Sequence, residues 1–298
     1  MSIRIVPLAD PHPSASSRRL VWLAVDGDGV PLGSAFLRLF DTEGQDHLAE
    51  LELSVHPAER RRGVGSELLA RAVAGVVAEG RRCVLAQAGA GTPGDRFLAE
   101  RGFRRVLTLT YARLALVNTV VDTAAGTAAG TAADRPPAGY RLLSWEGTVP
   151  DELAGTFTAS RRAMDDMPMD DTDYGVVVWD VERVRAAARA VEDRGERLHT
   201  VAAVDESDGS IAGFTELVVP GDGKGDGQHY GTGVLPEHRG RGLARWMKAE
   251  MIRQVRERYP DLTGLLADTA ESNTRMRAVN DALGYRPTHR TFQYQLDL

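Results

Sequence analysis

The sequence predicts a protein of the α/β (α+β) class that contains two domains of similar plan. Three observations support this fold: strand and helix patterns follow one another along the chain, a basic glycine turn occurs twice, and a low-complexity stretch lies between the two copies. With 298 residues, the chain is long enough for two domains that each bury a core of their own.

In the first half, apolar patterns predict a succession of short strands and two helices. Residues 48–55 show this clearly, because Leu51 and Leu53 alternate with Glu50 and Glu52 at the spacing of a half-buried strand. The expected strands are residues 3–8, 20–25, 33–40, 48–55, 84–88 and 106–116. The expected helices are a long one that ends at Gly80 and a short one at residues 95–101.

The second half repeats this order with one insertion. Its expected strands are residues 140–143, 199–204, 211–219, 228–234, 262–269 and 291–298. One helix pattern stops at Tyr259-Pro260, and another covers residues 271–283. Two further helix candidates, residues 151–164 and 181–194, lie between the first two strands, where the first half has only a short connection.

A run of alanine, glycine and threonine separates the two halves. It has too little apolar bulk to pack, so we expect a flexible linker at residues 121–137. The expected domains are therefore residues 1–120 and 138–298.

The strongest single pattern is the turn VLPEHRGRGLA at residues 234–244. It reads as the end of a strand, a tight turn and the first turn of a helix. Such a turn directs unpaired backbone N–H groups at a helix N-terminus toward one point, where a phosphate or pyrophosphate can bind. Gly240 and Gly242 let the backbone approach a ligand closely, and Arg239 and Arg241 add positive charge.

The first half carries a second copy of this turn, VHPAERRRGVG at residues 55–65. The two copies are offset by 179 positions, from Gly63 to Gly242. A second matched pair, RGFR at residues 101–104 and LGYR at residues 283–286, follows at nearly the same separation. Two landmarks in the same order indicate an internal duplication, and two unrelated arginine-glycine turns are the alternative.

The composition favours a soluble protein that binds neither nucleic acid nor membranes. A net charge of −6 argues against a general nucleic-acid binder. No apolar run approaches the ~20 residues of a membrane span, and the N-terminus shows no secretion signal, so a cytoplasmic location is expected. The single cysteine, Cys83, lies in an apolar run and is expected to be a buried thiol rather than a nucleophile.

The motif Arg-x-x-Gly-x-Gly/Ala after a strand, followed by helix, strand, helix and a late Gly-Phe/Tyr, resembles the GNAT superfamily of acyl-CoA-dependent N-acetyltransferases once in each half. The chain looks most like the tandem GNAT proteins, the group that includes mycothiol synthase. The resemblance implies two domains, each a mixed, mostly antiparallel sheet flanked by helices. It also implies that an acetyl group from acetyl-CoA, or from another short acyl-CoA, passes to a primary amine by direct attack. A non-catalytic acyl-CoA-binding protein is the alternative.

The resemblance also assigns residues to the cofactor. The phosphate cradle of the second half would be Arg239, Gly240, Arg241, Gly242, Leu243 and Ala244. That of the first half would be Arg60, Arg61, Arg62, Gly63, Val64 and Gly65. Amides that polarise the thioester would come from Val234 and Leu235, and from Val55 and His56. Asn273 matches an asparagine that contacts the cofactor in the family, where the first half has Gly91.

Candidates for proton transfer are fewer. The family often places a tyrosine four residues before the late glycine, and this chain has Asn280 and Leu98 there. Asn280 could donate a hydrogen bond to the sulfur but cannot act as an acid. His229 aligns with a frequent glutamate of the family, Glu216 is expected on the neighbouring strand, and Glu50 holds the aligned position in the first half. Ordinary strand residues, with deprotonation through water, are the alternative for all three.

The second half is expected to be the catalytic one, because in this family the two extra helices and their loop shape the acceptor site. The loop contains the acidic segment 165–173, whose five carboxylates would attract a cationic small-molecule or peptide amine. A solvated acidic loop is the alternative. We expect no metal site.

Replacing Gly242 with glutamate should abolish acetyl-CoA binding, because a carboxylate would occupy the phosphate cradle. Thermal-shift titration with acetyl-CoA measures this directly. The same change at Gly63 should matter less for activity, and unchanged affinity in Gly242→Glu would contradict the assignment of the cradle.

Overall fold

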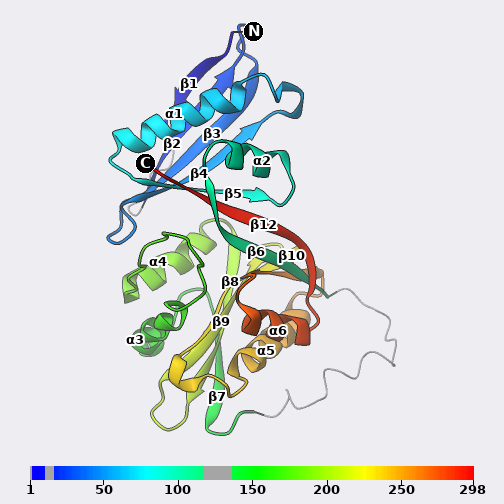
Figure 1. Cartoon of the computed structure of the whole chain (residues 1–298). Coiled ribbons are helices and arrows are strands. Elements are labelled where there is room, and N and C mark those ends of the chain that lie inside the picture. The colour runs from blue at the N-terminus through cyan, green and yellow to red at the C-terminus, as the bar shows by residue number, and fades with distance from the viewer. Residues whose placement is uncertain (1, 11–16, 117–135) are drawn as a thin grey trace. The chain divides into compact units, whose positions relative to one another are not determined.

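The computed structural model of the chain describes residues 2–10, 17–116 and 136–298, so the expected linker at residues 121–137 lies almost wholly outside the described residues. The chain forms two compact units (Figure 1). Unit 1 comprises Met1–Leu109, Met169–Val178 and Arg290–Leu298, and unit 2 comprises Thr110–Pro168 and Trp179–His289.

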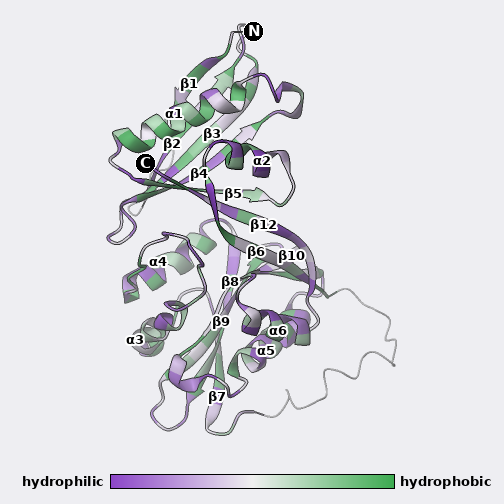
Figure 2. Ribbon diagram, viewed as in Figure 1, coloured by the Kyte–Doolittle hydropathy of each residue, from purple (hydrophilic) through white to green (hydrophobic). Residues whose placement is uncertain are grey.

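Unit 1 contains a mixed, mostly antiparallel sheet in the order β1-β2-β3-β4-β5-β12. Its elements are β1 (Arg4–Leu8), β2 (Ser17–Val25), β3 (Pro31–Phe40), β4 (Leu48–Val55), the 3-10 turn η1 (Pro57–Glu59), α1 (Val64–Ala78), β5 (Cys83–Gly89), α2 (Pro93–Glu100) and most of β12 (Arg286–Asp297). Only β4 and β5 run parallel. Helix α1 packs on one face of the sheet through Leu68, Ala72 and Val76, and Figure 2 shows the hydrophobic residues along it.

Unit 2 repeats this plan in the order β6-β11-β10-β9-β8-β7. Its elements are the end of β6 (Arg104–Ala115), β7 (Tyr140–Glu146), α3 (Asp151–Ser160), the 3-10 turn η3 (Arg161–Met164), α4 (Val181–Glu192), β8 (Glu196–Asp205), β9 (Ile211–Pro220), β10 (Gly225–Val234), the 3-10 turn η4 (Pro236–His238), α5 (Leu243–Arg258), β11 (Leu262–Ala270) and α6 (Thr274–Ala282). β10 and β11 pair in parallel, whereas the β9–β10, β8–β9 and β7–β8 pairs are antiparallel. The predicted fold class, with a mixed, mostly antiparallel sheet flanked by helices in each unit, is confirmed.

The last strand of each sequence half is exchanged between the units. β12 pairs with β5 from Thr291↔Gly89 to Asp297↔Cys83, although these strands come from opposite halves of the chain. In unit 2, the residue after β6, Leu116, donates its N–H to the Thr263 carbonyl of β11 at 2.9 Å. The compact units therefore do not follow the two halves of the sequence, because each sheet is completed by a strand from the other half.

A short segment of the second half also belongs to unit 1. Residues 169–178 follow η3 in sequence and pack against unit 1. Gln45 donates its Nε2–H to the Tyr174 carbonyl at 3.3 Å, and the Tyr174 ring lies 6.5 Å from that of Phe40. The Asp173 N–H donates to Gln295 Oε1 at 2.9 Å.

Several element boundaries differ from the sequence-based ones; β2 and β8, for example, begin three residues earlier than expected, at Ser17 and Glu196. The helix expected at residues 151–164 changes to a 3-10 turn after Ser160. β10 begins at Gly225 rather than residue 228, because its glycines pair with β11 instead of forming a turn. β12 begins at Arg286, five residues before the expected start, because its first five residues are all exposed and show no apolar alternation.

The two arginine-glycine turns have the same backbone geometry. The Arg60 Nε donates to the Val55 carbonyl at 3.2 Å, and the Arg239 Nε donates to the Val234 carbonyl at 2.8 Å. Each following helix begins at a glycine with positive φ, 90° at Gly63 and 81° at Gly242. The matching pair at the turn itself is Arg61 with φ 66° and Gly240 with φ 78°. The two turns therefore have the same backbone shape, although the first copy has Arg61 at the left-handed position that Gly240 holds in the second.

Arg61→Gly should stabilise unit 1 by about 0.5–1 kcal/mol. An L-residue in the left-handed region costs about 1–2 kcal/mol, and the extra freedom of glycine in the unfolded chain offsets part of the relief. The midpoint of chemical denaturation measures the change. Arg62→Gly is the matched control and should lower stability, because the φ of Arg62 is not positive. A loss in both variants would contradict strain at Arg61.

Candidate functional site

The parallel strands of unit 2 separate halfway along their length. β10 and β11 pair from Gly225↔Leu262 to Gln228↔Leu266, and their pairing ends there. β10 stays paired with β9 as far as Val234↔Gly213, with a bulge just after His229. We call this separation the split. It leads directly into the turn at residues 235–242.

The end of β10 presents one backbone amide toward the split. The Leu235 N–H donates to the Ala212 carbonyl at 2.9 Å, so that amide is used within the sheet. In an antiparallel ladder, hydrogen-bonded and non-hydrogen-bonded pairs alternate. The Val234–Gly213 pair is therefore non-hydrogen-bonded, and the Val234 N–H points away from β9. In unit 1 the His56 N–H donates to the Leu32 carbonyl in the same way, which leaves Val55 in the matching position.

The N-terminus of α5 forms an open cradle of backbone amides. Its N-cap, Gly242, supplies no side-chain hydrogen bond, and the first turn contains no acidic residue. A Cβ added at Gly240 or Gly242 would meet nothing within 4 Å, so space remains beside the backbone. The Leu243 side chain is buried in the core, which leaves its backbone for a ligand. Unpaired amides with free space suit an anion.

Arg239 holds the turn in place. Besides its bond to the Val234 carbonyl, it forms a two-pronged ion pair with Asp166, in which Nη2 lies 2.7 Å from Oδ1. The guanidinium beside Asp166 lowers the pKa of that carboxyl. Arg239 thus links β10, the turn and the segment after η3, and this structural role accompanies any contact with a ligand.

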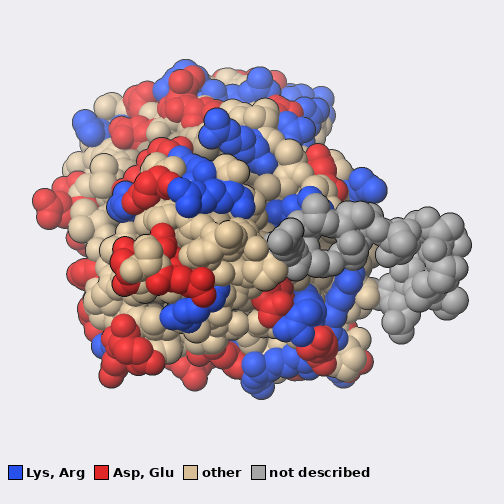
Figure 3. Space-filling model, turned by 90° about the horizontal axis from the view of Figure 1, so that it is seen from below, with Lys and Arg blue, Asp and Glu red and all other residues tan. Residues whose placement is uncertain are grey.

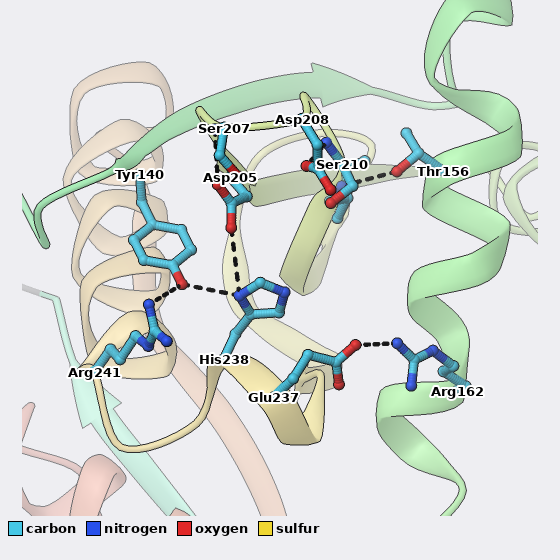
Figure 4. A network of polar contacts seen from close by, with 11 residues as sticks. Tyr140, Thr156, Arg162, Asp205, Ser207, Asp208, Ser210, Glu237, His238 and Arg241 are labelled. Carbon is cyan, nitrogen blue, oxygen red and sulfur yellow. Dashed lines mark hydrogen bonds and ion pairs between the residues drawn. The ribbon is translucent and has the colours of Figure 1, made fainter.

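Arg241 is held by a smaller network, which Figure 4 shows from close by. Its Nη1 donates to the Tyr140 hydroxyl at 2.9 Å, and that hydroxyl lies 2.8 Å from His238 Nδ1. His238 in turn lies 3.7 Å from Asp205. Because Arg241 has one neutral partner and no ion pair among the described residues, its charge is available to an anion in the cradle.

His229 lies inside unit 2, with 8% of its surface exposed. Its Nε2 lies 2.7 Å from the Tyr285 hydroxyl, and its buried Nδ1 has no partner among the described residues. Burial lowers the pKa of His229 well below its ordinary value, and the charge of Lys248 lowers it further. The imidazole is therefore neutral, and it positions the Tyr285 ring.

Glu216 is also buried, and it forms an ion pair with Arg161. The two guanidinium nitrogens lie 2.8 and 2.5 Å from the carboxylate oxygens. Three aromatic rings surround the guanidinium, with centroids 4.7 Å (Phe157), 4.8 Å (Trp179) and 4.6 Å (Phe214) away. This pairing compensates the buried charge of Glu216 and ties η3 to β9.

The two asparagines occupy different positions on α6. Asn273 is the N-cap residue, and its Oδ1 accepts the Met276 N–H at 3.1 Å. Asn280 is buried, and its Nδ2 donates to Thr269 Oγ1 at 3.3 Å. The Asn280 Oδ1 is buried without a partner among the described residues, so an acceptor remains available inside unit 2.

Lys248 of α5 is a buried titratable group that the pattern analysis did not single out. Only 2% of its surface is exposed, and its Nζ lies 5.2 Å above the Tyr285 ring. Burial lowers its pKa to about 7, against a smaller opposing effect of Asp268. Lys248 lies at helical spacing from the buried Ile252 and Val255, and this spacing would have indicated that its side chain is buried. Lysine is also rare here, with two among 36 lysines and arginines.

The cradle of the first half differs from that of the second. Helix α1 begins at Gly63 without a side-chain cap, but Glu67 lies in its first turn, where a carboxylate opposes anion binding. The Val64 side chain is buried, and a Cβ at Gly65 would touch the Phe97 ring at 3.4 Å. Arg60 is tied to Val55 and Arg62 to Glu59.

Three other candidates of the first half have structural contacts or positions of their own. His56 accepts the Ala58 N–H at its Nδ1, 3.3 Å away, and so caps η1. Arg61 holds the left-handed position of the turn. Glu50 lies on β4, where its Oε2 is 3.9 Å from Arg38 Nη1. Burial raises the pKa of Glu50.

The acidic segment 165–173 is divided between the two units. Asp166 pairs with Arg239 in unit 2. The Asp173 carboxylate lies 3.1 Å from His47 in unit 1, and the Asp171 carboxylate lies 4.0 Å from Arg104. Most of these carboxylates therefore have protein partners, so the segment does not form one acidic pocket within a unit.

Other kinds of site find no support in the described part of the chain. No three His, Cys, Asp or Glu side chains among the described residues are grouped so that they could hold a metal ion. None of the described helices is long and apolar enough to cross a membrane. On the face shown in Figure 3, basic and acidic side chains alternate around an uncharged area instead of forming a basic patch.

Comparison with known families matches both halves of the chain. Residues 162–285 match the acetyltransferase (GNAT) family model, and residues 17–105 match an acetyltransferase (GNAT) domain model. The chain therefore belongs to the GNAT family of acetyltransferases. It is a tandem member of that family and resembles mycothiol synthase.

Individual relatives agree with this assignment. A mycothiol acetyltransferase of Stackebrandtia nassauensis is 30% identical over 264 residues, covering 87% of this chain and 77% of that protein. One of Thermobispora bispora is 28% identical, covering 86% and 82%. A tandem GNAT protein from the clavulanic acid biosynthesis pathway shares the fold, with a TM-score of 0.77 at 23% identity, covering 99% of this chain and 98% of that one.

Lys248→Met should raise the free energy of unfolding at pH 7 by about 2–4 kcal/mol. The folded-state pKa of Lys248 is about 7, against 10.5 for the ordinary group, so between these values the unfolded chain binds more protons and stability rises with pH. Denaturation curves from pH 7 to 9 should therefore rise in the wild type and be flatter in the variant. Lys224→Met changes the only other lysine, which is exposed, and should leave the pH dependence unchanged. Parallel curves for wild type and Lys248→Met would contradict a neutral amine in the core.

Proposed function

We propose that the chain transfers an acetyl group from acetyl-CoA to a primary amine of a small molecule or peptide, and that the split and cradle of unit 2 form the catalytic site. The observation that carries this proposal is the uncapped, acid-free N-terminus of α5, which directly follows the Val234 amide. The names of the mycothiol acetyltransferases support a small-molecule acceptor.

The cofactor would be held mainly by main-chain groups. The amides of residues 240–244 and the charge of Arg241 fit a pyrophosphate, since the glycines leave open space beside the backbone. We place Asn273 beside the same ligand, because it caps the neighbouring helix α6. The first-half cradle is the weaker candidate because Glu67 lies in the first turn of α1.

Chemistry at this site needs a polarised carbonyl and a neutral amine. Bound acetyl-CoA would supply the activated thioester, and we assign the polarising hydrogen bond to the Val234 N–H, which points away from β9. The amine attacks the carbonyl carbon, the C–S bond breaks, and the thiolate takes up a proton. His229 and Glu216 both have protein partners, so we propose that the amine loses its proton through water. The free Oδ1 of Asn280 would accept the S–H of the product thiol.

A second candidate function is acyl-CoA binding without turnover. It is favoured by one observation, the presence of Asn280 and Leu98 where the family often has tyrosine. The Asn280 side chain cannot donate the proton that the leaving thiolate needs.

Release of free thiol distinguishes the two functions. The full chain is mixed with acetyl-CoA and a panel of amines at matched concentrations, and thiol is measured with a chromogenic reagent. Release that depends on both the amine and Gly242 supports acetyl transfer. Saturable acetyl-CoA binding without release from any amine supports the binding protein, and absence of binding overturns both.

Substitution of Arg241 and Arg239 should distinguish a residue that contacts the ligand from one that holds the turn in place. Arg241→Ala should weaken acetyl-CoA binding roughly 10- to 100-fold with little change in melting temperature, since a charge-assisted hydrogen bond contributes about 1.5–3 kcal/mol. Arg239→Ala should lower both affinity and melting temperature, because Arg239 ties the turn to Val234 and Asp166. Calorimetric titration and thermal unfolding measure the two effects. Equal loss of melting temperature in both variants would contradict the division of roles.

A further inference from the structure

Two side chains beside the cradle of unit 2, Tyr140 and His238, have no role in the proposed reaction (Figure 4). Tyr140 is the first residue of β7 and is buried, with 5% of its surface exposed. Its hydroxyl accepts a hydrogen bond from Arg241 Nη1 at 2.9 Å and lies 2.8 Å from His238 Nδ1. The Tyr140 ring also lies 5.7 Å from the guanidinium carbon of Arg241. An uncharged side chain therefore holds the arginine of the cradle.

The directions of the two hydrogen bonds at the Tyr140 hydroxyl follow from its partners. A guanidinium can only donate, so the hydroxyl oxygen accepts from Arg241. The hydroxyl proton remains for His238, which accepts it at Nδ1 when the imidazole carries its single proton on Nε2. Asp205 lies 3.7 Å from Nδ1, beyond hydrogen-bond distance. His238 thus fixes the rotation of the hydroxyl, and the hydroxyl oxygen is directed to Arg241.

The equivalent turn of unit 1 holds its arginine in a different way. The offset of 179 positions places Glu59 at the position of His238 and Arg62 at the position of Arg241. Both turns are 3-10 turns that begin with proline, and they end at Glu59 and at His238. Arg62 Nη1 donates to Glu59 Oε2 at 2.8 Å, which is an ion pair. A carboxylate therefore compensates the arginine of the first copy, whereas a phenol and an imidazole leave the second its full charge.

The position of Tyr140 also differs between the units. Tyr140 pairs with Asp205, the last residue of β8, and the corresponding pair of unit 1 is Arg4 with Val25, the last residue of β2. Arg4 has no hydroxyl, and Val25 has no carboxylate. The network therefore belongs to the unit whose cradle helix has no acidic residue in its first turn.

The way in which an arginine is held decides how well it can bind an anion. A flexible arginine loses rotational freedom when it binds a ligand, so one that is already held binds at a smaller entropic cost. A carboxylate partner holds the side chain but compensates its charge, as Asp166 does for Arg239. A hydroxyl partner holds the side chain and leaves the charge for the ligand. Arg241, with Tyr140 as its partner, is of this second kind.

We propose that Tyr140 and His238 are positioning residues for acetyl-CoA. His238 orients the Tyr140 hydroxyl, and the hydroxyl holds the Arg241 guanidinium where it can donate to the pyrophosphate. This inference rests on the proposed function of unit 2 and adds to it two residues that set the affinity for the cofactor. Neither residue makes or breaks a bond, so their effect is expected in the binding of acetyl-CoA and not in acetyl transfer itself.

A double-mutant cycle tests whether Tyr140 acts through Arg241. Acetyl-CoA is titrated calorimetrically into the full chain as wild type, Tyr140→Phe, Arg241→Ala and the double variant. Tyr140→Phe should weaken binding roughly three- to tenfold in the wild-type background and should have no further effect in Arg241→Ala. Equal losses in both backgrounds would mean that Tyr140 acts only through the general fold, and would overturn the inference.

Tyr259→Phe is the matched control for the loss of a hydroxyl. The Tyr259 hydroxyl lies 2.9 Å from His199 Nε2, so this variant also removes a tyrosine–histidine hydrogen bond from unit 2. Tyr259 lies at the other end of α5 from the cradle. The variant should therefore leave the affinity for acetyl-CoA unchanged.

Two variants of His238 test the role of charge. His238→Glu imitates Glu59 of unit 1 and should weaken acetyl-CoA binding roughly tenfold or more, because the new carboxylate would pair with Arg241. His238→Gln has the same shape as His238→Glu without the charge and should bind clearly more tightly than that variant. Equal affinities of the two variants would contradict the inference, and this comparison decides it even if Tyr140→Phe does not fold.

The wild-type titration separates this inference from the proposed function. If the wild-type chain does not bind acetyl-CoA, both are overturned. If it binds acetyl-CoA and the variants of Tyr140 and His238 bind with the same affinity, the proposed function stands and the positioning role is wrong.

Discussion

The uncapped start of α5 is the constraint around which unit 2 is organised. Four N–H groups at a helix N-terminus have no intrahelical partner, and here no side chain caps them. Water or an anion must satisfy them, so the surrounding contacts have to fix the backbone instead. Arg239 does this from one side through Val234 and Asp166, and buried Leu243 does it from the other.

The two halves show how one backbone plan can carry different side-chain chemistry. Both turns keep the arginine bond to the preceding strand and a left-handed glycine at the start of the helix. They differ in what surrounds the turn. The second half adds α3 and α4, buries Lys248 and His229, and pairs Glu216 with Arg161. The first half keeps an open polar face and an acidic first turn of its helix.

Local pattern was enough to find most strands, most helices and both turns. Strand alternation around Leu51 and helical spacing from Leu243 to Val255 are short-range signals, so they can be interpreted from one sequence. The partner of a strand is a long-range property. Nothing in residues 286–297 distinguishes pairing with β5 from pairing with β11, because either neighbour satisfies the same pattern.

The candidate site was predictable to the same degree. The cradle follows from the glycine spacing, because the conformation belongs to the backbone. Side-chain partnerships were not predictable, since Arg239 with Asp166 and His229 with Tyr285 join residues that are 73 and 56 positions apart. Such pairs depend on tertiary packing, and a buried histidine and an exposed one look the same in sequence.

The exchange of β12 into unit 1 has a consequence for biosynthesis. Gln87 of β5 contacts Thr291 of β12 across 204 positions of sequence. The strand that pairs with β5 is therefore synthesised only after the elements of unit 2, and until then the edge of β5 is open to pairing with other chains. The N-terminal half cannot finish folding during its own synthesis, so slow elongation or premature termination would expose an aggregation-prone edge.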